Sequence, residues 1–262
     1  MLIVLALAAA LNLPRPEHVV VVIEENHTLA QVIAKPGAAM YLQQVAHQGA
    51  LFTNAHGVTH PSLPNYIALF AGLTNSNGDA CPPRGIDSNA PNLASELARA
   101  HLSFAGYSEG LPAAGSTVCW AGPYARKHAP WVDFTNVPAQ DNLPLTLFPS
   151  FDRLPSVSFV VPNVDNDMHD GTVQQADAWA REHIAPLLAW ARTHSTLVVF
   201  TWDEGYDEAN SIPVIFAGPM VRPGTYQQRI DHYTVLHTIE AMYGLPPTGR
   251  AAQAGVIRSC WR

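Results

Sequence analysis

The sequence predicts an α/β fold, in which strands and helices alternate along the chain and build one mostly parallel sheet. Two observations predict it. The β-branched runs at 18–23 and 196–202 have the composition of strands that are buried on both faces. Segments with helical periodicity separate such strand-like runs, and no repeat or low-complexity tract interrupts the alternation.

The elements are expected in a regular order. After the strand at 18–23, a helix is predicted at 38–48, a short strand at Leu51, and a helix just after Ser62 that places Pro64 in its first turn. The later elements are helices at 92–101, 173–193 and 234–243, and strands at 103–107, 157–161, 196–202 and 213–217.

Regular signals lapse between residues 108 and 155, where Pro, Gly, Trp and Tyr are frequent. An irregular segment of that length inside a compact domain is usually functional, so we expect a lid or a pocket wall there. Trp120, Tyr124 and Trp131 in this segment either face a substrate or anchor the loop in the core.

Composition limits the organisation and the partners. A chain of 262 residues with 48% hydrophobic content can bury one core, so we expect a single domain over 15–262. The net charge of −7, with only 14 Lys plus Arg and no basic run, argues against a nucleic-acid-binding surface.

The first residues form an apolar run that ends in small residues. Such a run is typical of a signal peptide and is too short to span a bilayer, although no Lys or Arg precedes it. We therefore expect residues 1–14 to be a signal peptide and the protein to be secreted or periplasmic. The alternative is a buried first strand that Pro14 and Pro16 end.

The three cysteines fit an exported protein with one disulfide. Cys81 and Cys119 are the expected pair, since both lie in loop regions rich in Pro and Gly, and Cys260 would then be unpaired or partnered elsewhere. A zinc site is the weaker alternative, because no CxxC motif occurs and the cysteines are far apart.

Ser62 is the first candidate nucleophile. It lies between a predicted strand and a predicted helix, where a parallel sheet brings the chain to a helix N-terminus and an anionic phosphate binds readily. The alternative is that Ser62 is an ordinary helix N-cap.

Two carboxylate clusters each follow a strongly apolar strand. Glu24, Glu25 and Asn26 end the first strand, and Asp203 and Glu204 end the strand at 196–202. In open α/β sheets ligands gather at the carboxyl ends of the strands, and carboxylates brought together there repel one another unless a cation neutralises them. The clusters predict a divalent metal site; the alternative is that each is a polar turn that caps the next helix.

Five sequence blocks together resemble a known family: IEENHT, THPSLPNYIALFAG, VPNVDNDMHDG, TWDEG and DHYTVLHTIEAMYGL. They are similar, in family order from about residue 18 to 246, to the bacterial and fungal phosphoesterase family of secreted acid phosphatases and phospholipase C-like enzymes, within the alkaline-phosphatase-like superfamily. The resemblance implies a three-layer α/β/α sandwich and hydrolysis of a small phosphate ester through a phosphoserine.

The resemblance also implies residue roles. Ser62 would be the nucleophile, and the metal ligands would be Glu25, Asn26, Ser62, Asp203 and Glu204. Asn65 would hold a phosphate oxygen, and His60 and His169 would lie close to the transferred group. His232 is expected either to contact the substrate or to form part of a helix cap.

Oxygen ligands favour Mg, Mn or Ca, with zinc also compatible. We expect about one ion per chain, because two-metal relatives carry Asp-His-Gly where this chain has Asp203-Glu204-Gly205. A second ion would need ligands such as Asp167, His169 and His232.

Three other functions remain open. A phosphodiesterase or phospholipase C would use the same nucleophile and metal as a phosphomonoesterase. A metal-independent esterase would use Ser62, Asp203 and His232 as a triad, but the required elbow has Gly at both positions where this chain has His60 and Pro64. A non-catalytic binding protein would leave the matched ligand residues without a use.

Overall fold

The computed structural model describes residues 13–75 and 77–262. The predicted signal peptide therefore lies, up to residue 12, outside the described residues. The α-helices are α2 (Met40–Gln48), α3 (Ser62–Ala71), α4 (Leu93–Arg99), α5 (Val173–Ala191) and α6 (His232–Tyr243). The strands are β1 (His18–Glu24), β2 (Ala50–His56), β3 (Phe104–Ser108), β4 (Trp120–Ala121), β5 (Tyr124–Ala125), β6 (Asn142–Pro144), β7 (Val157–Val161), β8 (Thr196–Trp202), β9 (Ser211–Ala217), β10 (Gly224–Tyr226) and β11 (Ile230–Asp231).

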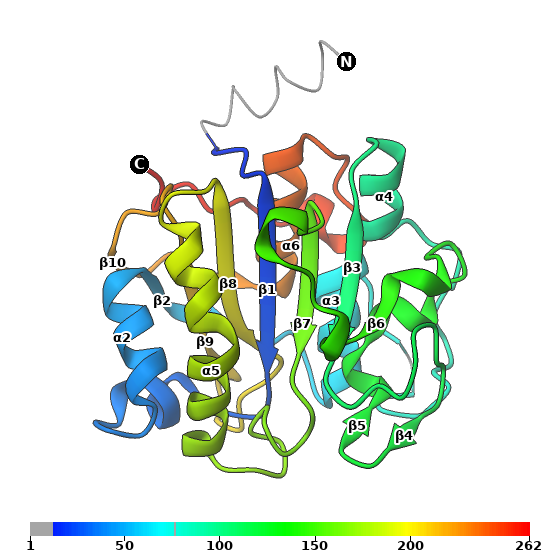
Figure 1. Cartoon of the computed structure of the whole chain (residues 1–262), viewed down its shortest axis with the longest axis horizontal. Coiled ribbons are helices and arrows are strands. Elements are labelled where there is room, and N and C mark those ends of the chain that lie inside the picture. Colours follow the sequence, from blue (N-terminus) through cyan, green and yellow to red (C-terminus); the bar gives the residue numbers. More distant parts are fainter. Residues whose placement is uncertain (1–12, 76) are drawn as a thin grey trace.

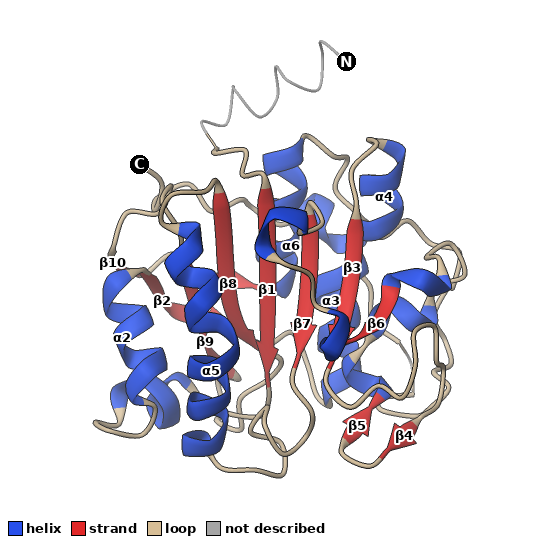
Figure 2. Ribbon diagram, in the orientation of Figure 1, coloured by secondary structure: helices blue, strands red, loops and turns tan. Residues whose placement is uncertain are grey.

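One nine-stranded sheet forms the centre of the molecule, in the order β10-β2-β9-β8-β1-β7-β3-β6, with β11 also paired to β2. The pairs β8-β1, β1-β7, β7-β3 and β3-β6 are parallel, and β9 runs antiparallel to both of its neighbours. The carboxyl ends of β1, β7 and β8 consequently lie at the same edge of the sheet (Figure 2).

Helices cover both faces of the sheet. Helices α2 and α5 pack together on one face, and α3 and α6 pack together on the other (Figure 1). Because both faces are covered, every residue from Val19 to Ile23 of β1 is at most 1% exposed, and the strand can be apolar throughout. The predicted three-layer α/β/α fold is confirmed.

The predicted elements are all present, with boundaries that differ by a few residues. The short strands β6, β10 and β11 at the sheet edges were not predicted, because two or three residues carry no measurable periodicity. No helix among residues 13–75 and 77–262 is long and apolar enough to cross a bilayer.

The irregular segment at 108–155 is held in place by a partly buried disulfide and two buried aromatic side chains. A disulfide joins Cys81 to Cys119, as predicted, and Cys260 is free and buried. Trp131 is buried against Gly106 of β3, where an added Cβ would lie 2.1 Å from the indole ring. Tyr124 is buried as well, whereas Trp120 is 58% exposed, so two of the three aromatic residues are core anchors.

Candidate active site

The register of β1 and β8 brings the two carboxylate clusters together. Glu24 pairs with Trp202 in the parallel ladder, so Glu25 and Asn26 lie next to Asp203 where both strands end. The Asn26 N–H donates to Asp203 Oδ1 at 2.9 Å, and the Asp203 N–H donates to the Glu24 carbonyl at 3.0 Å. Asn26 has a positive φ of 59°, a conformation that Asn tolerates better than most residues and that turns the chain sharply after β1.

Ser62 is the first residue of α3, and its side chain points into this cluster. The hydroxyl donates to Glu25 Oε2 at 3.1 Å, and Ser62 is only 2% exposed. The N-cap residue of α3 is Pro61, and no side chain makes a capping hydrogen bond to this helix. The alternative that Ser62 is an ordinary N-cap is therefore wrong.

The carboxylate of Asp79 and the ammonium of Lys127 form an ion pair at the N-terminus of α3. Asp79 accepts the Leu63 N–H at 2.9 Å through one carboxylate oxygen and binds Lys127 Nζ at 2.8 Å through the other. The same ammonium lies 3.0 Å from His169 Nε2, and His169 Nδ1 lies 2.7 Å from Asp170. Lys127 and Asp79 thus join His169 to the helix that carries Ser62, and neither was predicted as a site residue.

His128 is a third site residue that was not predicted from the sequence. It is 1% exposed; its Nε2 lies 2.9 Å from Glu25 Oε1 and its Nδ1 lies 3.0 Å from Asp167 Oδ2. The ring stacks on Tyr66 of α3, with centroids 5.2 Å apart and an interplanar angle of 8°. The predicted pocket wall at 108–155 therefore contributes an imidazole to the centre of the site.

The carboxylates of this cluster strongly affect one another's ionisation. Burial raises the pKa of Asp203 well above its usual value, and the charges of Glu25 and Glu204 raise it further. Burial acts in the same direction on Glu25, but the charge of His128 outweighs it and lowers the pKa of Glu25 to about 2. Burial disfavours the charged form of His128, yet Glu25 and Asp167 raise its pKa to about 10. The cluster attracts cations.

Two buried oxygens at this edge, Asn26 Oδ1 and Asp203 Oδ2, have no hydrogen-bond partner, whereas Glu25 Oε1 and Asp167 Oδ2 are paired with His128. A buried acceptor without a donor is costly unless a cation or water satisfies it. Both unpaired atoms belong to the predicted metal ligands, so the predicted set suits a divalent cation that prefers oxygen ligands.

A second combination, Glu25, His128 and His169, also has ligand atoms within 4.8 Å of one another. It shares Glu25 with the predicted set. However, the Lys127 ammonium already lies 3.0 Å from His169 Nε2, and its positive charge opposes a metal cation at that nitrogen.

Two further predicted site residues, His60 and Asn65, contact groups other than the carboxylates of Glu25 and Asp203. His60 Nδ1 lies 2.6 Å from Glu204 Oε2, so His60 contacts the site through a predicted ligand. The Asn65 amide donates to the carbonyls of Thr59 and Pro61 and accepts two backbone N–H groups. Both of its N–H donors are used, so Asn65 orders the turn before Ser62 and, in this arrangement, offers no donor to a phosphate oxygen.

His232 is buried at the start of α6. Its Nε2 donates to the Asp203 carbonyl at 2.6 Å, and burial lowers the pKa of its imidazole. Asp231 caps the helix by accepting the Thr234 N–H at 2.9 Å. The Ser62 hydroxyl donates its hydrogen bond to Glu25 and makes none with His232, so the Ser62-Asp203-His232 triad of an esterase is not assembled.

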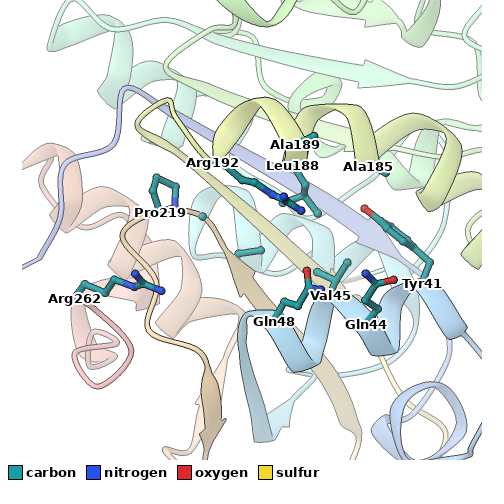
Figure 3. A pocket seen from close by; sticks show the side chains of 12 residues that line it. Tyr41, Gln44, Val45, Gln48, Ala185, Leu188, Ala189, Arg192, Pro219 and Arg262 are labelled. Atoms are coloured by element: carbon teal, nitrogen blue, oxygen red, sulfur yellow. The ribbon is translucent and has the colours of Figure 1, made fainter.

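A hollow of about 480 Å³ lies elsewhere in the structure, away from this cluster. Figure 3 shows Tyr41 and Gln44 of α2 on one side, and Leu188 of α5 with Arg192 just after that helix on the other. The hollow also reaches Gly218, which packs against Thr196 at the start of β8, and this is the end of β8 opposite Asp203. None of the predicted site residues lines it.

Comparison with known sequences is consistent with this geometry. The model of the family described as Phosphoesterase family matches residues 34–246. A protein named phosphatidylinositol-3-phosphatase from Mycobacterium tuberculosis is 49% identical over 258 residues, which cover 97% of this chain and 85% of that protein. A probable acid phosphatase from Kluyveromyces lactis is 34% identical over 80% of this chain, but the match spans only 55% of that protein.

Solved structures share the fold. The lipoteichoic acid synthase LtaP from Listeria monocytogenes aligns with a TM-score of 0.68 and 11% identity, over 94% of this chain and 76% of that one. A protein of the alkaline phosphatase superfamily from Vibrio parahaemolyticus aligns with a TM-score of 0.63 and 11% identity, over 97% of this chain and 79% of that one. At such low identity these alignments establish the fold alone.

Proposed function

Since the chain belongs to the Phosphoesterase family and is a phosphoric ester hydrolase, we propose that it cleaves phosphate monoesters through Ser62, with a divalent metal ion as cofactor. The observation that carries the proposal is the buried Ser62 hydroxyl, held 3.1 Å from Glu25 among unpaired ligand oxygens. The Mycobacterium tuberculosis relative makes phosphoinositides a natural substrate class to test.

The proposed ligands of the cation are Glu25, Asn26, Ser62, Asp203 and Glu204. A bound divalent cation would favour the alkoxide form of Ser62 and offset negative charge on the phosphoryl group. Glu25 has a low pKa and stays ionised, so its Oε2 can hold the Ser62 proton in the hydrogen bond already present.

In the proposed first step, Ser62 Oγ forms a bond to phosphorus while the bond from phosphorus to the leaving oxygen breaks on the opposite side. His169 and the Lys127 ammonium that donates to it would lie beside the phosphoryl oxygens, where the ammonium would stabilise their negative charge. His60 would approach the reacting group from the Glu204 side and protonate the leaving oxygen. Water then cleaves the Oγ–P bond of phospho-Ser62 and releases phosphate.

We further propose that residues 15–262 act as one catalytic domain of an exported protein. The continuous nine-stranded sheet and the Cys81–Cys119 disulfide support this proposal.

Hydrolysis of p-nitrophenyl phosphate and bis-p-nitrophenyl phosphate from pH 4 to 9, with and without EDTA and added divalent metals, tests the function. We expect chelator-sensitive cleavage of the monoester, a loss of about 10³-fold or more in Ser62→Ala, and no loss in Ser88→Ala. Ser88 is a fair control because its side chain makes no hydrogen bond in the described structure.

Other results would redirect the assignment. Faster cleavage of the diester would indicate a phosphodiesterase, and activity that survives chelation but not a serine-directed organophosphate would indicate an esterase. Elemental analysis should find about one divalent ion per chain. Two ions would make His169 and His232 ligands.

A further inference from the structure

A cavity of about 320 Å³ adjoins the candidate active site along the outer side of α3. Its polar lining residues are Thr59, His60, Thr74, Asn75 and Arg250. The volume falls at the lower end of the range for small-molecule sites, about 300 to 1,000 Å³, and suits a group of sugar size.

His60 connects this cavity to the site. Its side chain is 49% exposed and lines the cavity, while its Nδ1 lies 2.6 Å from Glu204. Pro61 and Pro64, on either side of Ser62 in the chain, line the same cavity. A substrate whose phosphoryl group lies at Ser62 would therefore have its leaving group within reach of the cavity.

Among the described residues, Arg250 and His60 are the basic side chains that line this cavity. It forms no ion pair in the described part of the chain; its side chain contacts the neutral hydroxyl of Tyr233. In a protein with a net charge of −7, an arginine without a carboxylate partner has its guanidinium available for an anion. Guanidinium groups bind phosphate with two parallel hydrogen bonds.

The backbone of Arg250 is fixed beside α3. Its N–H donates to the Gly72 carbonyl at 2.8 Å, where α3 ends. Gly72 and Gly249 have φ values of +68° and +47°, and a Cβ on Gly72 would lie 2.2 Å from the Thr248 carbonyl oxygen, so both glycines are needed for this close approach.

Thr248, two residues before Arg250, is held in place by Glu240 of α6. Buried Glu240 accepts its N–H at 2.9 Å and its hydroxyl at 2.6 Å through the same oxygen. Residues 248–250 are therefore positioned before any ligand arrives, which lowers the entropy cost of binding.

We propose that this cavity is a subsite for a second phosphate on the leaving group of the substrate, and that Arg250 binds that phosphate. The favoured substrates are then sugars or polyols that carry two phosphates. The inference rests on the proposed function, because it places the first phosphate at Ser62.

Steady-state kinetics with fructose 1,6-bisphosphate and fructose 6-phosphate test the subsite. For the wild-type enzyme we expect a lower KM for the bisphosphate. Arg250→Gln should raise that KM about tenfold with little change in kcat and with less than a twofold effect on the monophosphate, since it removes binding that is equal in ground and transition states. Arg250→Lys should restore part of the affinity.

Arg192→Gln is the matched control, because Arg192 is exposed, forms no ion pair among the described residues and lies in the distant hollow between α2 and α5. It should change neither KM. Equal effects of Arg250→Gln on the two substrates, or no effect on either, would overturn the subsite.

If the wild-type protein hydrolysed neither ester, the proposed function would fail, and calorimetric binding would still decide the subsite. Tighter binding of the bisphosphate than of the monophosphate, weakened about tenfold in Arg250→Gln, supports it. Equal binding of the two esters, or equal binding by the wild type and Arg250→Gln, contradicts it.

Discussion

Two regions of this molecule bury carboxylates in different surroundings. At the end of α6, Glu240 is fully buried; one of its oxygens accepts two hydrogen bonds from Thr248, and the other has no donor. At the carboxyl edge of the sheet, Asp203 is also buried with one oxygen that has no donor, but Glu25 and Glu204 lie beside it and add their negative charges. The first carboxylate fixes a loop, and the second belongs to a group of acceptors that converge on one point.

The difference shows that burial of an acid does not by itself indicate a reactive site. At Glu240 a single charge is buried, and the donors next to it belong to the fold. At the sheet edge several carboxylates share one space, and the buried imidazole of His128 lies between two of them, Glu25 and Asp167. Convergence of unpaired acceptors, and not the degree of burial, separates a candidate cation site from a structural anchor.

The largest expected effect on stability is that of His128→Gln. Removing the cation that lies between the two buried carboxylates Glu25 and Asp167 should lower the free energy of unfolding by about 3 to 5 kcal/mol near pH 6. The pKa of His128 is raised to about 10 in the folded protein, so its contribution is full below about pH 6.5, its unfolded value, and is lost as the pH rises through 10.

Urea unfolding in the presence of EDTA at pH 6 and pH 9.5 measures this effect. The difference between wild type and His128→Gln should be smaller at pH 9.5, and the exposed control His47→Gln should change little at either pH. A difference that grows with pH would show that His128 is not charged in the folded protein.

The next effect is that of Asp203→Asn, which separates catalysis from stability. We expect hydrolysis to fall about 100-fold, since a proposed metal ligand loses its charge. The metal-free protein should become more stable at pH 8. Burial and the charges of Glu25 and Glu204 raise the pKa of Asp203, so its ionisation opposes folding above its unfolded pKa.

Thermal melts with EDTA at pH 4 and pH 8, together with hydrolysis rates, check this prediction. The gain in Tm should be larger at pH 8. Asp165→Asn serves as the control, because Asp165 is exposed on the loop after β7. Loss of activity together with lower stability at pH 8 would instead mean that Asp203 has a structural role like that of Glu240.

Much of the fold could be predicted from the sequence because local composition determines it. The valine run of β1 and the apolar run of β8 are readable as strands buried on both faces, and parallel pairing then brings Glu25 next to Asp203. Ser62 was found for the same reason, since it lies between a strand and a helix.

The rest of the candidate site depends on tertiary contacts. Lys127 and His128 lie in a 3-10 turn within the irregular segment at 108–155, where no periodicity indicates which face is buried. Their only sequence signal is the run Arg126-Lys127-His128, which an exposed loop would carry equally well. The partners of Asn65 could not be predicted either, because they are set by the folding of the preceding turn onto α3.

The smallest expected effect tests the structural side of the comparison. Burial raises the pKa of Glu240 to about 8, outweighing its hydrogen bonds to Thr248, so above its usual value near 4.5 ionisation of this side chain opposes folding. Glu240→Gln keeps an oxygen that accepts from Thr248 and cannot ionise. Its Tm should therefore rise relative to wild type between pH 5 and pH 8, by about 2 to 4 °C for each 1 kcal/mol gained.

Calorimetric melts at the two pH values measure the change, with the exposed Glu208→Gln as the control. A variant that is less stable than wild type at pH 8 would show that the ionised carboxylate holds Thr248 better than a neutral amide does, and the two regions would then differ less than their hydrogen bonds suggest.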